Sequence, residues 1–179
     1  MQSAGLYAMM FSTKSPSYER AYRNQAGLLR QAEGRIEAMV TYDAFVAMPD
    51  GVELCTEVCL RVRGCTYPVV FLRNPYCPSD PAADNGVKGL ATVFVDRGYA
   101  VVHQHCRGTG RSQGDFLPFQ DDRRDGLETL GWIRRQPFYN GEIFLFGGSY
   151  MSAVHLAYLD PPPPDVKGAV LQVFDADRY

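Results

Sequence analysis

The sequence predicts an α/β fold in which a mostly parallel sheet is flanked by helices. Two apolar runs, at residues 68–72 and 99–104, lack polar alternation and are typical of strands buried on both faces. Each is followed by a segment with the length and apolar spacing of a helix, at 87–97 and 121–136. Strands that alternate with helices in this way favour a parallel sheet. The 179 residues are enough for one such domain with a sizeable core.

The N-terminal part is predicted to differ from the rest of the chain. We expect a leader and a helix within residues 1–35, followed by the sheet domain over 36–179. The helix is predicted at 17–31, where apolar side chains recur with a loose helical period. No internal repeat and no linker divides the sheet domain.

A β-hairpin and an open last strand are expected at the two ends of the sheet domain. Strand-like residues 39–48 and 52–62 flank Pro49-Asp50-Gly51, which has the composition of a turn. This hairpin is predicted at an edge of the sheet. The last predicted strand, 167–173, is apolar and has no following strand in this chain. An unpaired apolar edge promotes association, so we expect self-association through this strand.

Composition excludes several classes of partner. The net charge of −2 lacks the basic surface that binds nucleic acid, and no apolar run approaches the ~20 residues of a membrane helix. The five cysteines form an odd set without a C-x-x-C pair, so they are interpreted as small buried side chains rather than a disulfide framework. We therefore predict a cytoplasmic protein that binds neither nucleic acid nor membranes.

The most informative stretch is a strand that turns directly into a helix at a serine. An apolar run ends at Gly147-Gly148, Ser149 follows, and residues 153–159 are compatible with a helix. Such a turn presents a hydroxyl as a nucleophile, and glycines allow the close, strained backbone that it needs. Gly147-x-Ser149 fits this nucleophile elbow. Met151 departs from it, because the usual G-x-S-x-G motif has glycine there.

Three histidines and one cysteine of the chain are candidates for metal-binding or general-base roles. His103 and His105 would project from one strand face and could pair with Cys106 or Asp115 around a metal ion. Cys106 alternates to the other face and no third ligand is evident, so neither a metal nor a cofactor is predicted. His155 follows Ser149 by six positions on the same helix, about 9 Å along its axis, and cannot act as its base.

A glycine-rich loop follows the second buried strand. Gly108-x-Gly110-x-x-x-Gly114 stands where a dinucleotide-binding loop would, but it misses the G-x-G-x-x-G spacing. Residues 115–118 contain a proline where the helix of such a motif should begin. We therefore interpret this segment as a structural loop.

Several short motifs occur in a specific order between about Thr41 and Tyr179. They are Met48-Pro49-Asp50-Gly51, Arg73-Asn74-Pro75-Tyr76, Gly98-Tyr99-Ala100-Val101-Val102, Arg107-Gly108-Thr109-Gly110-Arg111-Ser112-Gln113-Gly114-Asp115-Phe116, Asp125-Gly126, Trp132-Ile133, Gln136-Pro137, Asn140-Gly141 and Gly147-Gly148-Ser149-Tyr150. In this order the chain resembles the α/β-hydrolases of the Xaa-Pro dipeptidyl-peptidase and cocaine-esterase family. Two departures from the family pattern are Ser152, in place of a glycine, and His105, in place of an aspartate.

The resemblance implies a serine hydrolase that acts on small ester substrates or on short-peptide amides. It implies Ser149 as the nucleophile, with an oxyanion hole formed by the Tyr150 backbone N–H and the Tyr76 hydroxyl. The amide fits this role because it follows the nucleophile near a helix N-terminus. Tyr76 fits because it follows a buried strand, and ligands bind at the carboxyl ends of such strands.

The resemblance also implies that much of the enzyme is missing from this chain. In the family the acid and base come after the nucleophile and a helical cap, and a C-terminal β-sandwich follows. We therefore expect the N-terminal portion of an α/β-hydrolase domain, truncated after the strand that follows the nucleophile helix, without the triad His and Asp. Two alternatives stay open at this point. The chain could be a non-catalytic truncated remnant, or half of an enzyme that a second chain completes.

Overall fold

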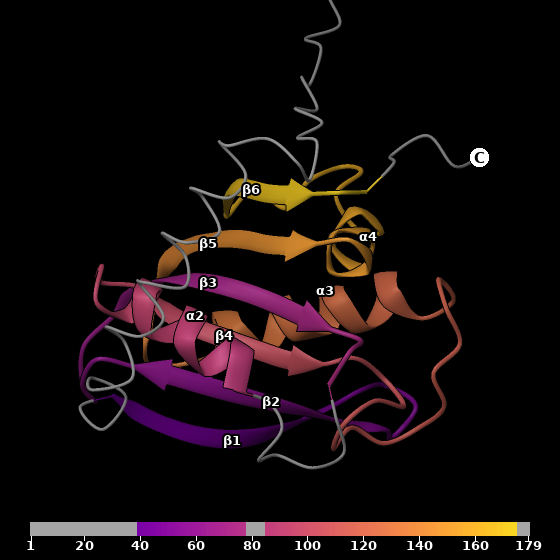
Figure 1. Cartoon of the computed structure of the whole chain (residues 1–179), viewed down its shortest axis with the longest axis horizontal. Coiled ribbons are helices and arrows are strands. Elements are labelled where there is room, and N and C mark those ends of the chain that lie inside the picture. Colours follow the sequence, from indigo (N-terminus) through magenta and orange to yellow (C-terminus); the bar gives the residue numbers. More distant parts are fainter. Residues whose placement is uncertain (1–38, 78–84, 175–179) are drawn as a thin grey trace, which may run out of the picture.

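The computed structural model describes residues 39–77 and 85–174. They form a six-stranded mixed sheet with three helices around it, none of which is long and apolar enough to cross a membrane (Figure 1). The leader and the helix predicted at 17–31 lie outside the described residues. The elements are β1 (Val40–Ala47), β2 (Glu53–Leu60), β3 (Tyr67–Asn74), α2 (Asn85–Val95), β4 (Ala100–His105), α3 (Asp122–Arg134), β5 (Tyr139–Gly148), α4 (Tyr150–Leu156) and β6 (Val166–Gln172).

The strand order across the sheet is β1-β2-β4-β3-β5-β6. β1 and β2 form the predicted hairpin at one edge, with Val46 opposite Leu54, and β2 is also antiparallel to β4. β4, β3, β5 and β6 are parallel, so their carboxyl ends lie along one side of the molecule (Figure 1). The predicted α/β fold is therefore confirmed. In open α/β sheets, ligands bind outside these carboxyl ends.

Successive residues of β3 show why a continuous apolar run predicts a buried strand. Val70 packs in the cluster that contains Ala91 of α2. The next residue, Phe71, packs in the cluster that contains Leu130 of α3. Since neighbouring side chains of a strand point to opposite faces, the two helices cover the two faces of the sheet. Val70 and Phe71 are 2% and 0% exposed, and burial on both faces accounts for the missing polar alternation.

A buried ionic cluster attaches α3 to the carboxyl ends of β3 and β4. Arg73 is fully buried, and it donates to Gln104 Oε1 over 3.1 Å and to the Asp122 carbonyl over 2.8 Å. Arg107 makes two hydrogen bonds to the Asp125 carboxylate, at 3.0 and 2.8 Å. Hydrogen bonding to that carboxylate raises the pKa of Arg107 above its usual value. Buried charges need such partners, because an unpaired ion in the interior is costly.

The helix after Ser149 begins earlier than the sequence predicts. The sequence predicts a helix over 153–159, whereas α4 spans Tyr150–Leu156. The Ser149 carbonyl accepts the amides of Ser152 and Ala153, at 2.9 and 3.4 Å, so helical hydrogen bonding starts at the serine itself. Ser149 is therefore the residue immediately before the helix.

β6 is the outer strand at the far edge of the described sheet. Within residues 39–77 and 85–174 it pairs with β5 on one side, and Val170 is 49% exposed. Self-association through this edge stays a prediction.

Candidate active site

Ser149 occupies a sharp turn between β5 and α4. Its backbone angles are φ 56° and ψ −129°, in a region that residues other than glycine rarely adopt. The turn is held by the hydrogen bond from the Ser149 amide to the Gln172 carbonyl of β6, at 2.8 Å. Its side chain is exposed at the carboxyl-end edge of the sheet. This is the geometry of a nucleophile elbow, in which backbone strain holds the hydroxyl outward.

The glycine two residues before the serine is required by packing. A Cβ at Gly147 would lie 2.5 Å from the Met151 carbonyl oxygen and 2.6 Å from its carbonyl carbon. β5 and α4 therefore approach too closely at this point for any side chain. Met151 itself stands where the usual motif has a second glycine, and it packs partly buried beside the α2-side cluster.

Ser152 has a structural role in the elbow. Its hydroxyl is buried and lies 2.9 Å from the Gly147 carbonyl and 3.0 Å from the Gln172 carbonyl. It also accepts the Gln172 amide over 3.0 Å. One hydroxyl thus connects β5, α4 and β6 directly beneath Ser149. A glycine at this position, as in the family pattern, would leave the Gly147 carbonyl and the Gln172 backbone groups without the hydroxyl as a partner. No local sequence pattern indicates this role of Ser152.

Two hydrogen-bond donors converge beside the Ser149 hydroxyl. Tyr76 follows β3, and its hydroxyl donates to Ser149 Oγ over 3.3 Å. The Tyr150 amide donates to the Tyr76 hydroxyl oxygen over 3.2 Å. The Tyr76 backbone is held by a 2.9 Å hydrogen bond from its amide to Asn74 Oδ1, which closes the turn after β3. All three predicted site residues therefore meet at one place.

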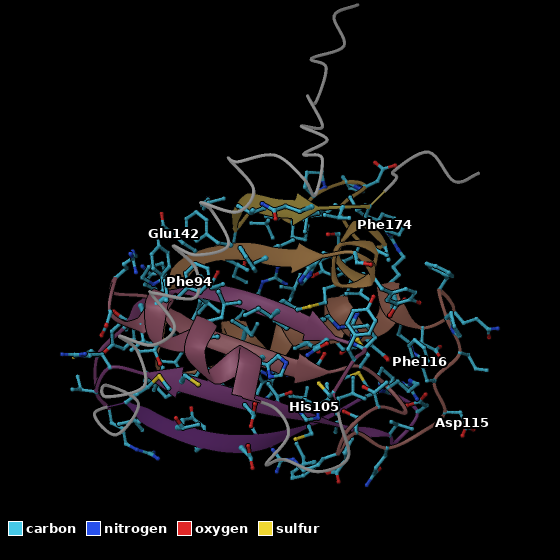
Figure 2. All side chains as sticks on the ribbon, viewed as in Figure 1. Phe94, His105, Asp115, Phe116, Glu142 and Phe174 are labelled. Carbon is cyan, nitrogen blue, oxygen red and sulfur yellow. The ribbon has the colours of Figure 1, made fainter. Side chains whose placement is uncertain are left out.

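The side chain of Tyr150 anchors the start of α4. Its hydroxyl accepts the Phe119 amide over 2.8 Å and donates to Asp122 Oδ2 over 3.2 Å. Burial, followed by the nearby Asp122 carboxylate, raises the pKa of Tyr150, and burial also raises the pKa of Asp122. The rings of Phe116 and Phe119 lie 5.8 and 4.9 Å from the Tyr150 ring. This aromatic group borders the site, and Figure 2 labels Phe116 in the loop at the carboxyl-end side of the sheet.

His155 lies in the core, on the side of α4 that packs against β3. It is fully buried, its Nδ1 is hydrogen-bonded to the Tyr158 hydroxyl, and its ring contacts Phe71 at a centroid distance of 5.5 Å. Burial lowers the pKa of His155 to about 3, so it stays neutral. This agrees with its exclusion as the base of Ser149.

A second cluster of reactive side chains lies at the ends of β3 and β4. His103 Nδ1 and Glu57 Oε2 are 3.0 Å apart, and this hydrogen bond lowers the pKa of Glu57. On its other side, His103 Nε2 lies 3.8 Å from Cys77 Sγ. The ring of His105 is 5.3 Å from that of His103, and Figure 2 shows His105 at the carboxyl end of β4. Cys77, rather than Cys106, is therefore the cysteine that joins the two histidines.

No local sequence signal joins Cys77 to the histidines, because it is 26 positions from His103. Only the parallel pairing of β3 with β4 brings these residues together. Cys106 lies near Arg73 and Asp122 instead, where burial raises its pKa to about 12.

Comparison with known proteins identifies the family. A family model for X-Pro dipeptidyl-peptidases, the S15 family, matches residues 50–179. The chain belongs to this family. It is 38% identical over 140 residues to cocaine esterase of Rhodococcus sp. (strain MB1 Bresler), an alignment that covers 78% of this chain and 24% of that protein. The resemblance inferred from the motifs is therefore confirmed.

Solved structures of hydrolases share the fold. An alpha-amino acid ester hydrolase superposes with a TM-score of 0.62 and 28% identity over 74% of this chain and 25% of its own. A CocE/NonD family hydrolase from Staphylococcus aureus gives a TM-score of 0.61 at 23% identity over 73% of this chain and 27% of its own, which shows a common fold. The S15 chain thus spans about a quarter of the length of the relatives that it matches.

Proposed function

We propose that this chain carries the nucleophile and the oxyanion hole of a serine hydrolase that cleaves acyl bonds, either esters or short-peptide amides. The observation that carries the proposal is a chain of hydrogen bonds at a strained serine, in which the Tyr150 amide donates to the Tyr76 hydroxyl and that hydroxyl donates to Ser149 Oγ. Tyr76 Oη lies 3.3 Å from Ser149 Oγ and 3.2 Å from the Tyr150 amide nitrogen. Membership of the S15 family, and relatives whose names describe ester hydrolysis, support the same reaction class.

The proposed reaction begins with attack of Ser149 Oγ on the substrate carbonyl carbon. A new C–O bond forms, the carbonyl π electrons move to oxygen, and the hydroxyl proton passes to a general base. The resulting oxyanion collapses and expels the alcohol or amine, which leaves with a proton. Water then cleaves the acyl–serine ester in the same two steps. The strained backbone of Ser149 holds Oγ in place for this attack without further ordering.

The oxyanion is proposed to take over the hydrogen bonds that now join Tyr76, Ser149 and Tyr150. In the free site the Tyr76 hydroxyl donates to Ser149 Oγ, and the Tyr150 amide donates to the tyrosine oxygen. A substrate oxygen placed between them would accept a hydrogen bond from each donor. Removing one such donor typically lowers kcat by about 10²- to 10³-fold. The Tyr76 side chain is 59% exposed, so substrate can reach this position.

We infer that the general base comes from outside these 179 residues. A serine hydroxyl is a weak nucleophile until a base accepts its proton. His155 is buried and neutral on the core side of α4, so it cannot do so. The family resemblance implies that an acid and a base follow the nucleophile in the sequence.

The test is labelling of Ser149 by a fluorophosphonate, with and without added imidazole as an external base. We expect slow labelling of the 179-residue chain that imidazole accelerates, with the adduct on the peptide that contains Ser149. Ser149→Ala should abolish the adduct. Tyr76→Phe should slow the imidazole-dependent reaction by about 10²-fold, because one oxyanion donor is lost.

The matched control is Ser112→Ala, which removes a serine of the loop after β4 that donates to the His105 carbonyl. It should label like the unmodified chain. Equal imidazole-dependent labelling of wild type and Ser149→Ala would overturn the proposal, as would an adduct on another residue.

A further inference from the structure

We propose that Cys77, His103 and His105 form a binding site for one divalent metal ion of the zinc class, at the carboxyl ends of β3 and β4. The three side chains each offer one ligand atom, and these atoms lie within 4.8 Å of one another. The site lies beside the proposed oxyanion donor Tyr76 but is argued from its own residues. It does not depend on the hydrolase function.

The spacing of the ligand atoms suits tetrahedral coordination. Zinc binds thiolate sulfur at about 2.3 Å and imidazole nitrogen at about 2.0–2.1 Å, so two such ligands around a tetrahedral ion are about 3.6 Å apart. Cys77 Sγ and His103 Nε2 are already 3.8 Å apart. The widest of the three separations, at most 4.8 Å, must close by about 1 Å, which a small ring rotation provides.

A carboxylate already orients His103 for this role. Glu57 on β2 pairs in register with His103, and its Oε2 lies 3.0 Å from the ring Nδ1. The carboxylate favours the tautomer with its proton on Nδ1, which leaves the Nε2 lone pair directed at Cys77. Metal-binding histidines in proteins are commonly held by a carboxylate in this way.

His105 must give up one hydrogen bond to bind the ion. Its Nδ1 now accepts the Arg111 amide over 3.2 Å. If Nδ1 binds the ion, it can no longer accept the Arg111 amide. If Nε2 binds the ion, Nδ1 carries the proton and is a donor, so it cannot accept that amide either. Either route costs about 1 kcal/mol, the usual value of one such bond, and a thiolate–metal bond offsets it readily. Metal binding should therefore release the Arg111 amide.

The loop after β4 fits closely over the cluster. Gly110 has φ +55°, and a Cβ there would lie 2.8 Å from Cys77 Cβ and would also overlap the ring of His105. Only glycine allows the loop to pass at this distance. Cys77, His103 and His105 are 8%, 1% and 4% exposed, so the ligands lie beneath the loop rather than on the surface.

The donor set selects the kind of metal. A thiolate with two imidazoles suits zinc and its neighbours, whereas magnesium and calcium prefer oxygen ligands. Binding releases the Cys77 thiol proton, so the sulfur becomes a thiolate bonded to the ion. Three protein ligands leave a fourth position, which water can fill. Without metal, the Cys77 thiol donates to the Asn74 carbonyl over 3.4 Å, so the cluster is also stable as a purely structural group.

The test is a cobalt(II) titration in a Cys65→Ser background, which removes the exposed cysteine. We expect a thiolate-to-cobalt absorption band in the near ultraviolet that saturates at one ion per chain and disappears when zinc(II) displaces the cobalt. Cys77→Ser should abolish the band. Glu57→Gln should weaken the affinity by about 10- to 100-fold, because the carboxylate no longer orients His103.

The matched control is Cys106→Ser, which removes the buried cysteine that follows His105 and lies near Arg73. It should keep the band. A second measurement keeps all three ligands and follows the Arg111 amide by NMR. Zinc(II) should shift the resonance of this amide and speed its hydrogen exchange. Absence of the thiolate band in the folded background protein, or a one-to-one band that survives Cys77→Ser, would overturn the proposal.

Discussion

Replacement of Gly147 by alanine tests whether the close contact between β5 and α4 positions Ser149. The new Cβ would lie 2.5 Å from the Met151 carbonyl oxygen, whereas ordinary contacts begin at 3.4 Å, so about 0.9 Å of movement is needed (3.4 − 2.5). The obstacle is backbone rather than a flexible side chain. Overpacking of this kind typically costs about 1–3 kcal/mol, so we expect the free energy of unfolding to fall by that amount.

The same movement should misplace Ser149, the proposed nucleophile. A shift of about 1 Å at a catalytic group can cost about 10²-fold in rate. We therefore expect imidazole-dependent fluorophosphonate labelling of Ser149 to slow by that factor in Gly147→Ala. Unfolding is measured with denaturant and circular dichroism, and labelling by mass spectrometry of the peptide that contains Ser149.

Gly148 provides a matched control one residue along the same strand. A Cβ there would meet no atom within 4 Å. Gly148→Ala should therefore leave stability unchanged or raise it by about 0.4–1 kcal/mol, through the lower entropy of the unfolded chain. If the two variants unfold within about 0.5 kcal/mol of each other and label at equal rates, the packing argument for Gly147 is wrong.

Three further outcomes follow from the ion pairs and the sheet edge. Asp125→Asn should lower the free energy of unfolding by about 3–5 kcal/mol, because it removes the charged partner of the buried Arg107. The more exposed ion pair between Arg111 and Asp43 should contribute under about 1 kcal/mol. Hydrogen bonds from Arg134 lower the pKa of Asp165 to about 2, below its unfolded value of about 3.9. Its stabilisation is therefore present above pH 4 and lost between about pH 4 and 2 in denaturant titrations, and Asp165→Asn should flatten this dependence. Val170→Lys on β6 should reduce any concentration-dependent association seen by sedimentation velocity, and equal association in both chains would contradict association through this edge.

Several features could be predicted from the sequence because local chemistry determines them. The continuous apolar run of β3 predicts a strand buried on both faces, and residues 69–72 are buried whichever face they point to. The turn residues after Met48 predict the hairpin. Gly147 and Ser149 predict the elbow, because a strained strand-to-helix turn restricts which residues can occupy it.

Other features depend on contacts between distant segments, which no local pattern records. Ser152 replaces a glycine, and only the three-dimensional structure shows its hydroxyl bonded to β5 and β6. His103 and His105 were expected to lack a third ligand, because alternation along one strand turns Cys106 away. Cys77 reaches them from the neighbouring strand.

The sequence by itself determined the α/β class, the hairpin, the family and the turn at Ser149, because each depends on short local patterns or on their order along the chain. The tertiary structure decided which side chains meet. Parallel pairing brings the ends of β3, β4 and β5 to one side of the sheet. That placement sets the Tyr76 hydroxyl beside Ser149 and the Cys77 thiol beside two histidines, across separations of 73 and 26 positions.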